Sequence, residues 1–388
     1  MALARSPALD DPLALRHAGR ELLGLALMDT RNLLLALLPQ LEDAADGTLR
    51  RRVLTAGAWP EWWIGRNVQR ARGPAAATDQ PRLPSLEPRL DDWLAGADQP
   101  SLDELRNYLA ATLELTLDLL AMAAETDAGL YLFRQALRHE DRLVESLRET
   151  LREGAPPPRP DRAPLLVPAR RWVLGQPAAA GAEGGYVPEA ERGFEEVAVP
   201  AFEIDAQPVN WARFAEFAED GGYDDDTLWS SAGRQWRDAG GHRAPAFVEQ
   251  ITGGVVVQRG HAARARLEKA PQQQAAAHVT RHEAEAWCRW AGRRLPLEPE
   301  WTLAAATLPR LGFAWGDVHE WVAGRARGFG AAAETPAPAA ALDVPRPGLG
   351  VLCGASWATL PRWRHAGARR FADPADDRHC SGFRSCLL

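Results

Sequence analysis

The sequence has few of the residues that build disulfide frameworks or membrane spans. Only four of its 388 residues are cysteines, and no two of them form a C-x-x-C pair, so the chain lacks the spacing of a disulfide-stapled scaffold. The longest apolar stretch, residues 22–38, carries Asp29 and Arg31 and does not have the pattern of a membrane helix. The first ten residues also lack the basic-then-apolar pattern of a secretory leader. We therefore expect a cytoplasmic chain without a membrane partner.

An excess of positive charge is also missing. The 45 Lys and Arg residues are outnumbered by 52 Asp and Glu residues, which gives a net charge of −7, so nothing indicates nucleic acid as a partner. The composition is 46% hydrophobic and 25% charged, which is ordinary for a globular protein. A chain of this length is too long for one hydrophobic core, and two domains are expected.

The first part, residues 1–153, is predicted to be a four-helix bundle. Apolar residues recur at helical spacing over four segments, and Ser101 with Glu104 has the pattern of a capping box. Four long helices with one long connection, residues 73–100, are typical of a bundle. The helices are expected at residues 13–41, 48–70 (interrupted by a proline), 101–125 and 127–152.

Residues 154–196 are rich in Pro, Ala and Gly and are predicted to connect two domains, with residues 165–173 able to pack as an extended strap. From residue 197 to 388 the pattern changes to short alternating stretches, turn signals and two short helices, at residues 211–218 and 281–290. The pattern alone indicates an irregular α+β domain.

Five segments of this second part resemble the formylglycine-generating-enzyme type of domain, whose fold is akin to C-type lectins. Ordered along the chain, they are H-V-T-R-H-E-A-E-A-W-C-R-W-A-G at residues 278–292, R-R-L-P-L-E-P-E-W at 293–301, W-G-D-V-H-E-W at 315–321, and C-G-A-S-W at 353–357 followed by G-F-R-S-C at 382–386. With a helical domain in front, the chain resembles the sulfoxide synthases of ergothioneine biosynthesis and, more closely, selenoneine synthases. The resemblance implies that the bundle is DinB-like.

The resemblance also implies a non-haem iron(II) site in the bundle. In these synthases three histidines hold the ion, two from an H-x3-H-x-E motif on one helix face and one from a G-H that precedes a W-F-x-E-x-W segment. This chain reads H-E-D-R-L-V-E at residues 139–145. His139 stands at a ligand position and Glu145 at the motif glutamate, which is not expected to ligate. Leu143 occupies the second ligand position, and a leucine has no lone pair to donate.

The third ligand position has no histidine either. The second helix reads L-T-A-G-A-W-P-E-W-W at residues 54–63, with Ala56 and Gly57 where the G-H is expected. Two of the three expected ligands are therefore missing by residue type. The carboxylates of Asp141 and Glu145 do not replace them, because helix geometry turns both away from the face of His139. His278 and His282 are also four residues apart, but at a strand–helix junction where a metal is not expected.

Further residues are candidates for substrate binding. Arg66, beyond the tryptophans of the second helix, is placed to hold a substrate carboxylate; a solvated arginine is the alternative. If the family geometry holds, Trp315, Asp317 and Glu320 line a cleft between the domains, where an aromatic face and an acid suit a trimethylammonium group. The remaining single histidines are predicted to be solvated or structural: His242, His261, His319, His365 and His379.

Two functions follow as hypotheses. The first is an iron enzyme that uses oxygen to form a C–Se or C–S bond on the imidazole of hercynine (trimethylhistidine), with a selenosugar or thiol as donor. The second is a degenerate or repurposed relative that lacks the iron site and binds a small zwitterionic ligand or a protein partner. The fold and the domain order favour the first hypothesis, and the residues at positions 56, 57 and 143 favour the second.

Overall fold

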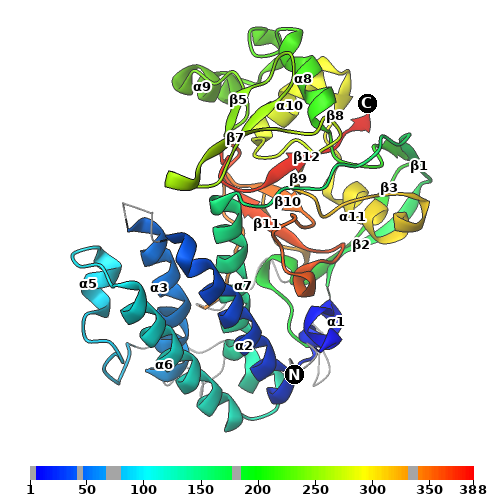
Figure 1. The fold of residues 1–388 in the computed structure, drawn as a ribbon. Coiled ribbons are helices and arrows are strands. Elements are labelled where there is room, and N and C mark those ends of the chain that lie inside the picture. Colours follow the sequence, from blue (N-terminus) through cyan, green and yellow to red (C-terminus); the bar gives the residue numbers. More distant parts are fainter. Residues whose placement is uncertain (1–5, 42–46, 67–79, 177–184, 331–339) are drawn as a thin grey trace.

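The chain folds into a helical part and a part built of short strands and helices, with the C-terminus at the far end of the second part (Figure 1). The structure is a computed structural model, and it describes residues 6–41, 47–66, 80–176, 185–330 and 340–388.

Four long helices pack against one another in the helical part. Helix α7 contacts both α2 and α3, and α6 contacts the same two helices, which gives the four-helix arrangement expected from the apolar spacing. Two clusters of buried, mostly leucine side chains fill the interior. The four helices are α2 (Arg20–Leu37), α3 (Thr48–Pro60), α6 (Leu102–Ala121) and α7 (Asp127–Leu151).

The expected helix boundaries hold in outline and differ in detail. Ser101 and Glu104 form the expected capping box at the start of α6. The helix expected at residues 13–41 is instead broken around Gly19 into α1 (Pro12–Arg16) and α2, and it ends in the 3-10 turn η2 (Leu38–Leu41). The other elements of this part are the 3-10 turn η1 (Pro7–Asp10) and the π-helical turn η3 (Glu61–Gly65), which follows the proline that ends α3.

The connection expected to be a loop at residues 73–100 contains a short helix, α5 (Leu90–Ala95), so that prediction was wrong in part. Leu90 and Trp93 are buried against the bundle core. The burial of two large apolar side chains explains why the segment is ordered as a helix despite its many prolines. Residues 73–79 of this connection lie outside the described residues.

A buried ion pair ties α2 to α7. The guanidinium of Arg31 donates to both oxygens of Glu140, at 2.6 and 2.9 Å, and to the carbonyl of Ala56 at 3.2 Å. The segment Arg20–Leu41 has the length and hydropathy of a membrane span, as core helices of soluble proteins also do. One of its charged residues, Arg31, lies inside the bundle, where it is 2% exposed.

The second part contains two four-stranded sheets and two small ones. The first sheet has the order β1 (Leu165–Val167), β4 (Phe202–Ile204), β13 (Cys386–Leu387), β8 (Arg293–Arg294). The second has the order β11 (Arg369–Ala372), β10 (Gly350–Cys353), β9 (His319–Val322), β12 (Ser381–Phe383). The small sheets are β2 (Arg170–Gln176) with β3 (Gly193–Val199), and β5 (Val248–Gln250) with β6 (Val256–Arg259) and β7 (Arg266–Lys269).

Four helices pack around these sheets. They are α8 (Trp211–Glu219), α9 (Ser231–Gly240), α10 (Arg281–Trp290) and α11 (Glu298–Thr307). Helices α8 and α10 match the expected segments, and Thr280 caps α10 through a capping box with Glu283. Short strands, short helices and long loops give the irregular α+β character that the sequence predicts.

The segment expected to connect two domains contributes strands to the second part. Within residues 154–196, β1 pairs with β4 and β2 pairs with β3 over seven residue pairs. The 3-10 turn η4 (Glu189–Glu191) also lies in this segment and buries Ala190 and Glu191. Main-chain pairing with distant strands therefore orders a stretch whose composition alone indicates a linker.

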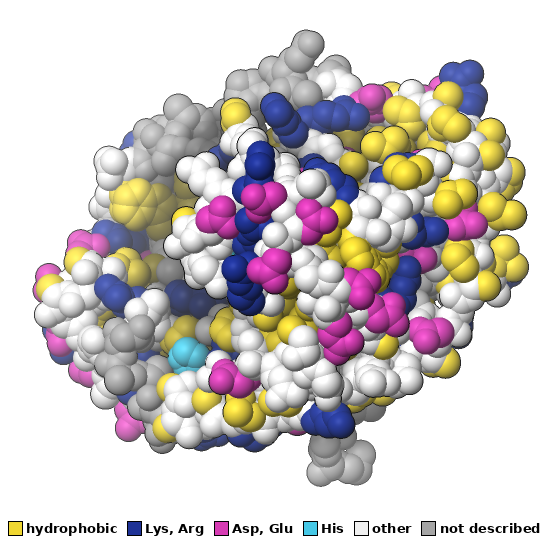
Figure 2. All heavy atoms as spheres, turned by 90° about the horizontal axis from the view of Figure 1, so that it is seen from above, with side chains coloured by type: hydrophobic (Ala, Val, Ile, Leu, Met, Phe, Trp, Pro, Cys, Tyr) yellow, Lys and Arg dark blue, Asp and Glu magenta, His cyan; other side chains and the backbone are white. Residues whose placement is uncertain are grey.

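Helix α7 extends from the bundle to the sheet that contains β9, β10 and β11 (Figure 1). The face of the molecule seen from above shows basic and acidic side chains interspersed among apolar ones (Figure 2). Charged residues of the two parts contact each other at this junction between α7 and the sheet.

Candidate functional site

His139, the retained residue of the expected iron motif, lies on α7 and faces the bundle. Its ring stacks on Trp59 of α3, with centroids 5.6 Å apart and an angle of 21° between the planes. Burial lowers the pKa of His139 to about 4, so the imidazole is neutral at neutral pH. Its Nδ1 atom is buried and has no hydrogen-bond partner among the described residues.

At the second expected ligand position the side chain is part of the bundle core. Leu143 is 8% exposed and belongs to the same apolar cluster as Val53 and Leu54 of α3 and Leu147 of α7. One helical turn from His139, this position therefore supplies core contacts and no donor atom.

The third expected position has no space for a side chain that could ligate. A Cβ atom placed on Gly57 would lie 2.7 Å from Cε1 of Tyr108 and 3.0 Å from Oγ1 of Thr112, closer than carbon atoms pack. Ala56 is 1% exposed, and its carbonyl accepts a hydrogen bond from Arg31. A histidine at either position would have to displace the interior of the bundle.

No other imidazole joins His139. All nine histidines of the chain lie among the described residues. Within those residues, one group of three side chains brings metal-binding atoms within 4.8 Å of one another, and His139 is not part of it. The residues present therefore do not fit the three-histidine iron site of the synthases that the sequence resembles.

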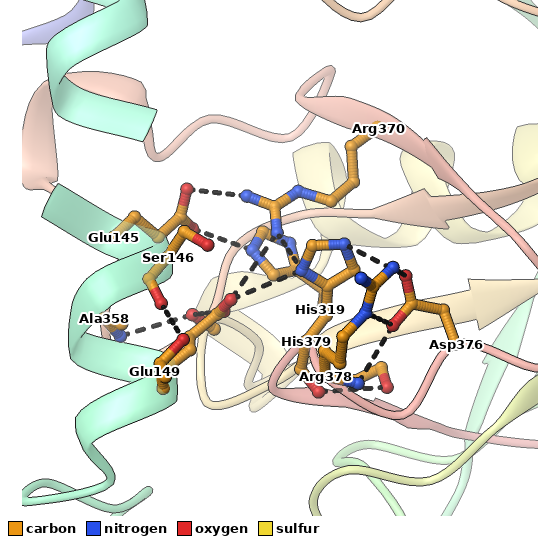
Figure 3. Close-up of polar contacts among 12 residues, drawn as sticks. Glu145, Ser146, Glu149, His319, Ala358, Arg370, Asp376, Arg378 and His379 are labelled. Carbon is orange, nitrogen blue, oxygen red and sulfur yellow. Dashed lines mark hydrogen bonds and ion pairs between the residues drawn. The ribbon is translucent and has the colours of Figure 1, made fainter. Parts of the chain in front are cut away.

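The group with metal-binding atoms consists of Glu145, Glu149 and His319. The two glutamates are four residues apart and share the face of α7 that meets the sheet. His319 is the first residue of β9, and its Nε2 atom lies 2.8 Å from Oε1 of Glu145. Figure 3 shows these side chains converging at the junction of the helix and the sheet.

A guanidinium lies within this group. Nη2 of Arg370, on β11, donates to Oε2 of Glu145 at 2.6 Å, and Nη1 lies 3.9 Å from Oε2 of Glu149. His379 completes the group, with Nδ1 3.4 Å from the same oxygen of Glu149 (Figure 3). Arg370 thus supplies positive charge where a metal ion between the two carboxylates would supply it.

The pKa values of the cluster follow from burial and from Arg370. Burial acts to raise the pKa of Glu145, but Arg370 and the hydrogen bond with His319 hold it well below its usual value. The pKa of Glu149 falls to about 2, since His379 and Arg370 outweigh its burial. Burial and the charge of Arg370 lower the pKa of His319 to about 4. At neutral pH the cluster holds two carboxylates, a neutral His319 and one guanidinium.

This cluster binds the two parts of the chain together and leaves little room for a ligand. The adjoining cavity, lined by residues that include Arg138, Arg142 and His319, measures about 20 Å³. A space of this size holds about one water molecule and not an amino-acid derivative. In the sequence His319 and His379 stand alone, because their carboxylate partners Glu145 and Glu149 lie on α7, far away along the chain. The signal that the sequence offers for this cluster is the i, i+4 spacing of Glu145 and Glu149.

The residues predicted to bind substrate are dispersed. Arg66 follows η3, donates to the carbonyl of Leu83 at 2.8 Å and lies 3.8 Å from Glu61. Both oxygens of Glu320 are bound by Arg384, at 2.5 and 2.7 Å, and Glu320 is fully buried.

The carboxylate of Asp317 is bound by Arg159, with Nη2 2.7 Å from Oδ1. Trp315 is partly buried and packs edge-on against Trp301, with ring centroids 5.8 Å apart. Trp321 is fully buried in another core cluster of the second part. The carboxylates of Asp317 and Glu320 thus form ion pairs with arginines of the chain itself, and both lie in the interior of the second part.

Comparisons with known proteins support the resemblance. Residues 157–331 match the sulfatase-modifying factor enzyme 1-like domain family. Hercynine oxygenase of Mycolicibacterium thermoresistibile is 32% identical over 345 residues, which cover 81% of this chain and 73% of that protein. The chain belongs to the hercynine oxygenase family.

Two further relatives match shorter stretches of this chain. Hercynine oxygenase of Mycolicibacterium smegmatis is 34% identical over 252 residues, which cover 61% of this chain and 56% of that protein. Formylglycine-generating enzyme of Streptomyces coelicolor is 30% identical over 185 residues, 41% of this chain and 52% of that protein. The chain thus spans about half the length of these two relatives.

Proposed function

We propose that this chain is a member of the hercynine oxygenase family that binds a hercynine-like amino-acid betaine and does not carry out iron-dependent oxygenation. The observation that carries the proposal is the packing at the expected ligand positions. Leu143 lies in the bundle core, and Gly57 has no space for a larger side chain.

The physical reason is the number of nitrogen donors. A non-haem iron(II) site that activates oxygen needs several protein ligands and open positions for the reactants. His139 offers one buried Nδ1 atom, and among the described residues it belongs to no group of three or more metal-binding side chains. One imidazole does not hold a divalent ion tightly against water, since most of the coordination shell would remain solvent.

The alternative is an active synthase that forms a C–Se or C–S bond on the imidazole of hercynine, with a selenosugar or thiol as donor. It is favoured by the family membership and by the helical bundle in front of the second part, which we infer to be DinB-like. That function would need iron(II) held by ligands other than the three histidines of the family motif, because His139 is the one histidine of that set that the chain retains.

Binding and turnover of hercynine distinguish these two functions. We expect hercynine to bind the purified protein in calorimetry, and to remain unchanged when ferrous iron, oxygen and a thiol or selenosugar donor are supplied and the mixture is analysed by mass spectrometry. The hercynine oxygenase of Mycolicibacterium thermoresistibile, assayed in the same buffer, serves as the positive control. Repeated turnover of hercynine to an oxidised or chalcogen-substituted product by this chain would overturn the proposal.

A further inference from the structure

A pocket at the junction of the two parts has the chemistry of a zwitterion site. It lies between α1, the end of β2, η4 and the 3-10 turn η9 (Pro361–Trp363). Its cavity volume is about 190 Å³, which is below the range of about 300–1,000 Å³ that is usual for sites of drug-sized ligands and restricts the pocket to a small ligand.

A buried carboxylate with an unpaired oxygen lines this pocket. Glu191 is 1% exposed, and its Oε1 atom has no hydrogen-bond partner among the described residues. Its other oxygen, Oε2, lies 3.2 Å from Nε2 of Gln176 and 3.3 Å from Nε2 of His365. A buried acceptor without a partner is costly, and a positively charged group in the pocket would offset this cost.

Two aromatic rings border the same space. Tyr186 and Trp363 both line the pocket, with ring centroids 6.2 Å apart and planes at 74°. The ring of Trp363 already supports one cation, because the guanidinium carbon of Arg138 lies 4.5 Å from its centroid. Aromatic rings beside a carboxylate are the usual surroundings of a quaternary ammonium group.

Positive charge lies at another edge of the pocket. Arg16, at the end of α1, donates to Oε1 of Gln176, and the amide nitrogen of Gln176 donates to Glu191. A single amide group thus separates a guanidinium from a carboxylate. A ligand with a cationic nitrogen and a carboxylate on the same carbon matches this arrangement of charge.

We propose that this pocket binds an amino-acid betaine, with its quaternary nitrogen next to Glu191, Tyr186 and Trp363 and its carboxylate toward Arg16. This inference rests on the proposed function, which supplies hercynine as the ligand to test, and it adds the place of binding. The pocket lies on the side of α7 that carries Asp141, since Trp363 donates to Asp141 at 2.7 Å, whereas His139 faces Trp59 in the bundle.

The test is calorimetry with hercynine on the full chain and on three variants. Glu191→Gln removes the charge and keeps the shape, and we expect binding at least about tenfold weaker, as for loss of a buried charge partner. Glu189→Gln is the matched control, since this residue lies in the same turn η4 and pairs instead with Arg192 at 3.5 Å; its binding should stay unchanged. Leu13→Trp should also weaken binding, because Leu13 lines the pocket and is 65% exposed, so a larger side chain there fills the pocket without disturbing the core.

The outcomes separate the place of binding from the proposed function. If hercynine binds Glu191→Gln and Leu13→Trp as tightly as it binds the unaltered chain, this pocket is not the hercynine site. The proposed function would then be unaffected. If hercynine fails to bind but tetramethylammonium binds and is lost in Glu191→Gln, the pocket stands as a cation site and the proposed function falls. If neither probe binds the unaltered chain, both are overturned.

Discussion

Replacing Arg362 with methionine is expected to lower the free energy of unfolding by about 3–5 kcal/mol, the usual cost of removing one partner from a buried ion pair. Arg362 comes from η9 of the second part and is 1% exposed. Its guanidinium donates to both oxygens of Asp141 on α7, at 2.7 Å each, and to Asp29 on α2 at 2.8 Å. Burial disfavours the charge, but Asp141 and Asp29 raise the pKa of Arg362 above its usual value. The loss would remove the guanidinium that neutralises the carboxylates of Asp141 and Asp29.

Urea unfolding followed by circular dichroism measures this effect. Arg378→Met is the matched control, because the Arg378 side chain is 82% exposed in its pair with Asp376, and such pairs contribute about 0–1 kcal/mol. The double variant Arg362→Met with Asp141→Leu should recover part of the lost stability, since it no longer buries an unpaired carboxylate at position 141. A loss below about 1 kcal/mol in the single variant would show that the guanidinium does not hold the two parts together.

Replacing Arg370 with methionine is expected to create a zinc site where the unaltered chain has none. The change removes the positive charge beside Glu145 and Glu149 and leaves both carboxylates with His319 and His379. Carboxylates and neutral imidazoles are zinc ligands, and a divalent ion would replace the lost charge. The variant alone should be less stable by about 3–5 kcal/mol, and zinc should raise its melting temperature.

The unaltered chain is the comparison for this experiment, and zinc should leave its melting temperature unchanged. Adding Glu149→Ala to Arg370→Met removes one ligand and should abolish the effect of zinc. Stoichiometric zinc on the unaltered chain, lost in Glu149→Ala, would contradict our view that the guanidinium takes the place of a metal ion.

Local signals in the sequence predicted the four long bundle helices, α8 and α10, but they did not predict α5, α9 or α11. The capping boxes that begin α6 and α10 are each formed by residues three apart, so they can be recognised without knowledge of the fold. Residues 165–173 were predicted to be able to pack as an extended strap, but their pairing as β1 and β2 was not predicted, because the partner strands β4 and β3 lie farther along the chain. A composition rich in Pro and Ala does not reveal such pairing.

Contacts between residues far apart in the sequence were likewise not predicted for the site. The residue types at positions 56, 57 and 143 indicate missing iron ligands directly from the sequence. By contrast, the cluster of Glu145 with His319 joins residues 174 positions apart, and the pocket at Glu191 joins α1 to η4 and η9. The predicted role of Glu320 in a cleft depended on family geometry, and in this chain the arginine at position 384 binds that carboxylate in the core.

The iron content of the purified full chain after anaerobic incubation with ferrous iron and removal of the excess tests the central claim most directly. With His139 as the one imidazole at the expected site and Leu143 in the core beside it, we predict no stoichiometric iron by elemental analysis. One tightly held iron per chain, lost in His139→Ala, would contradict the account.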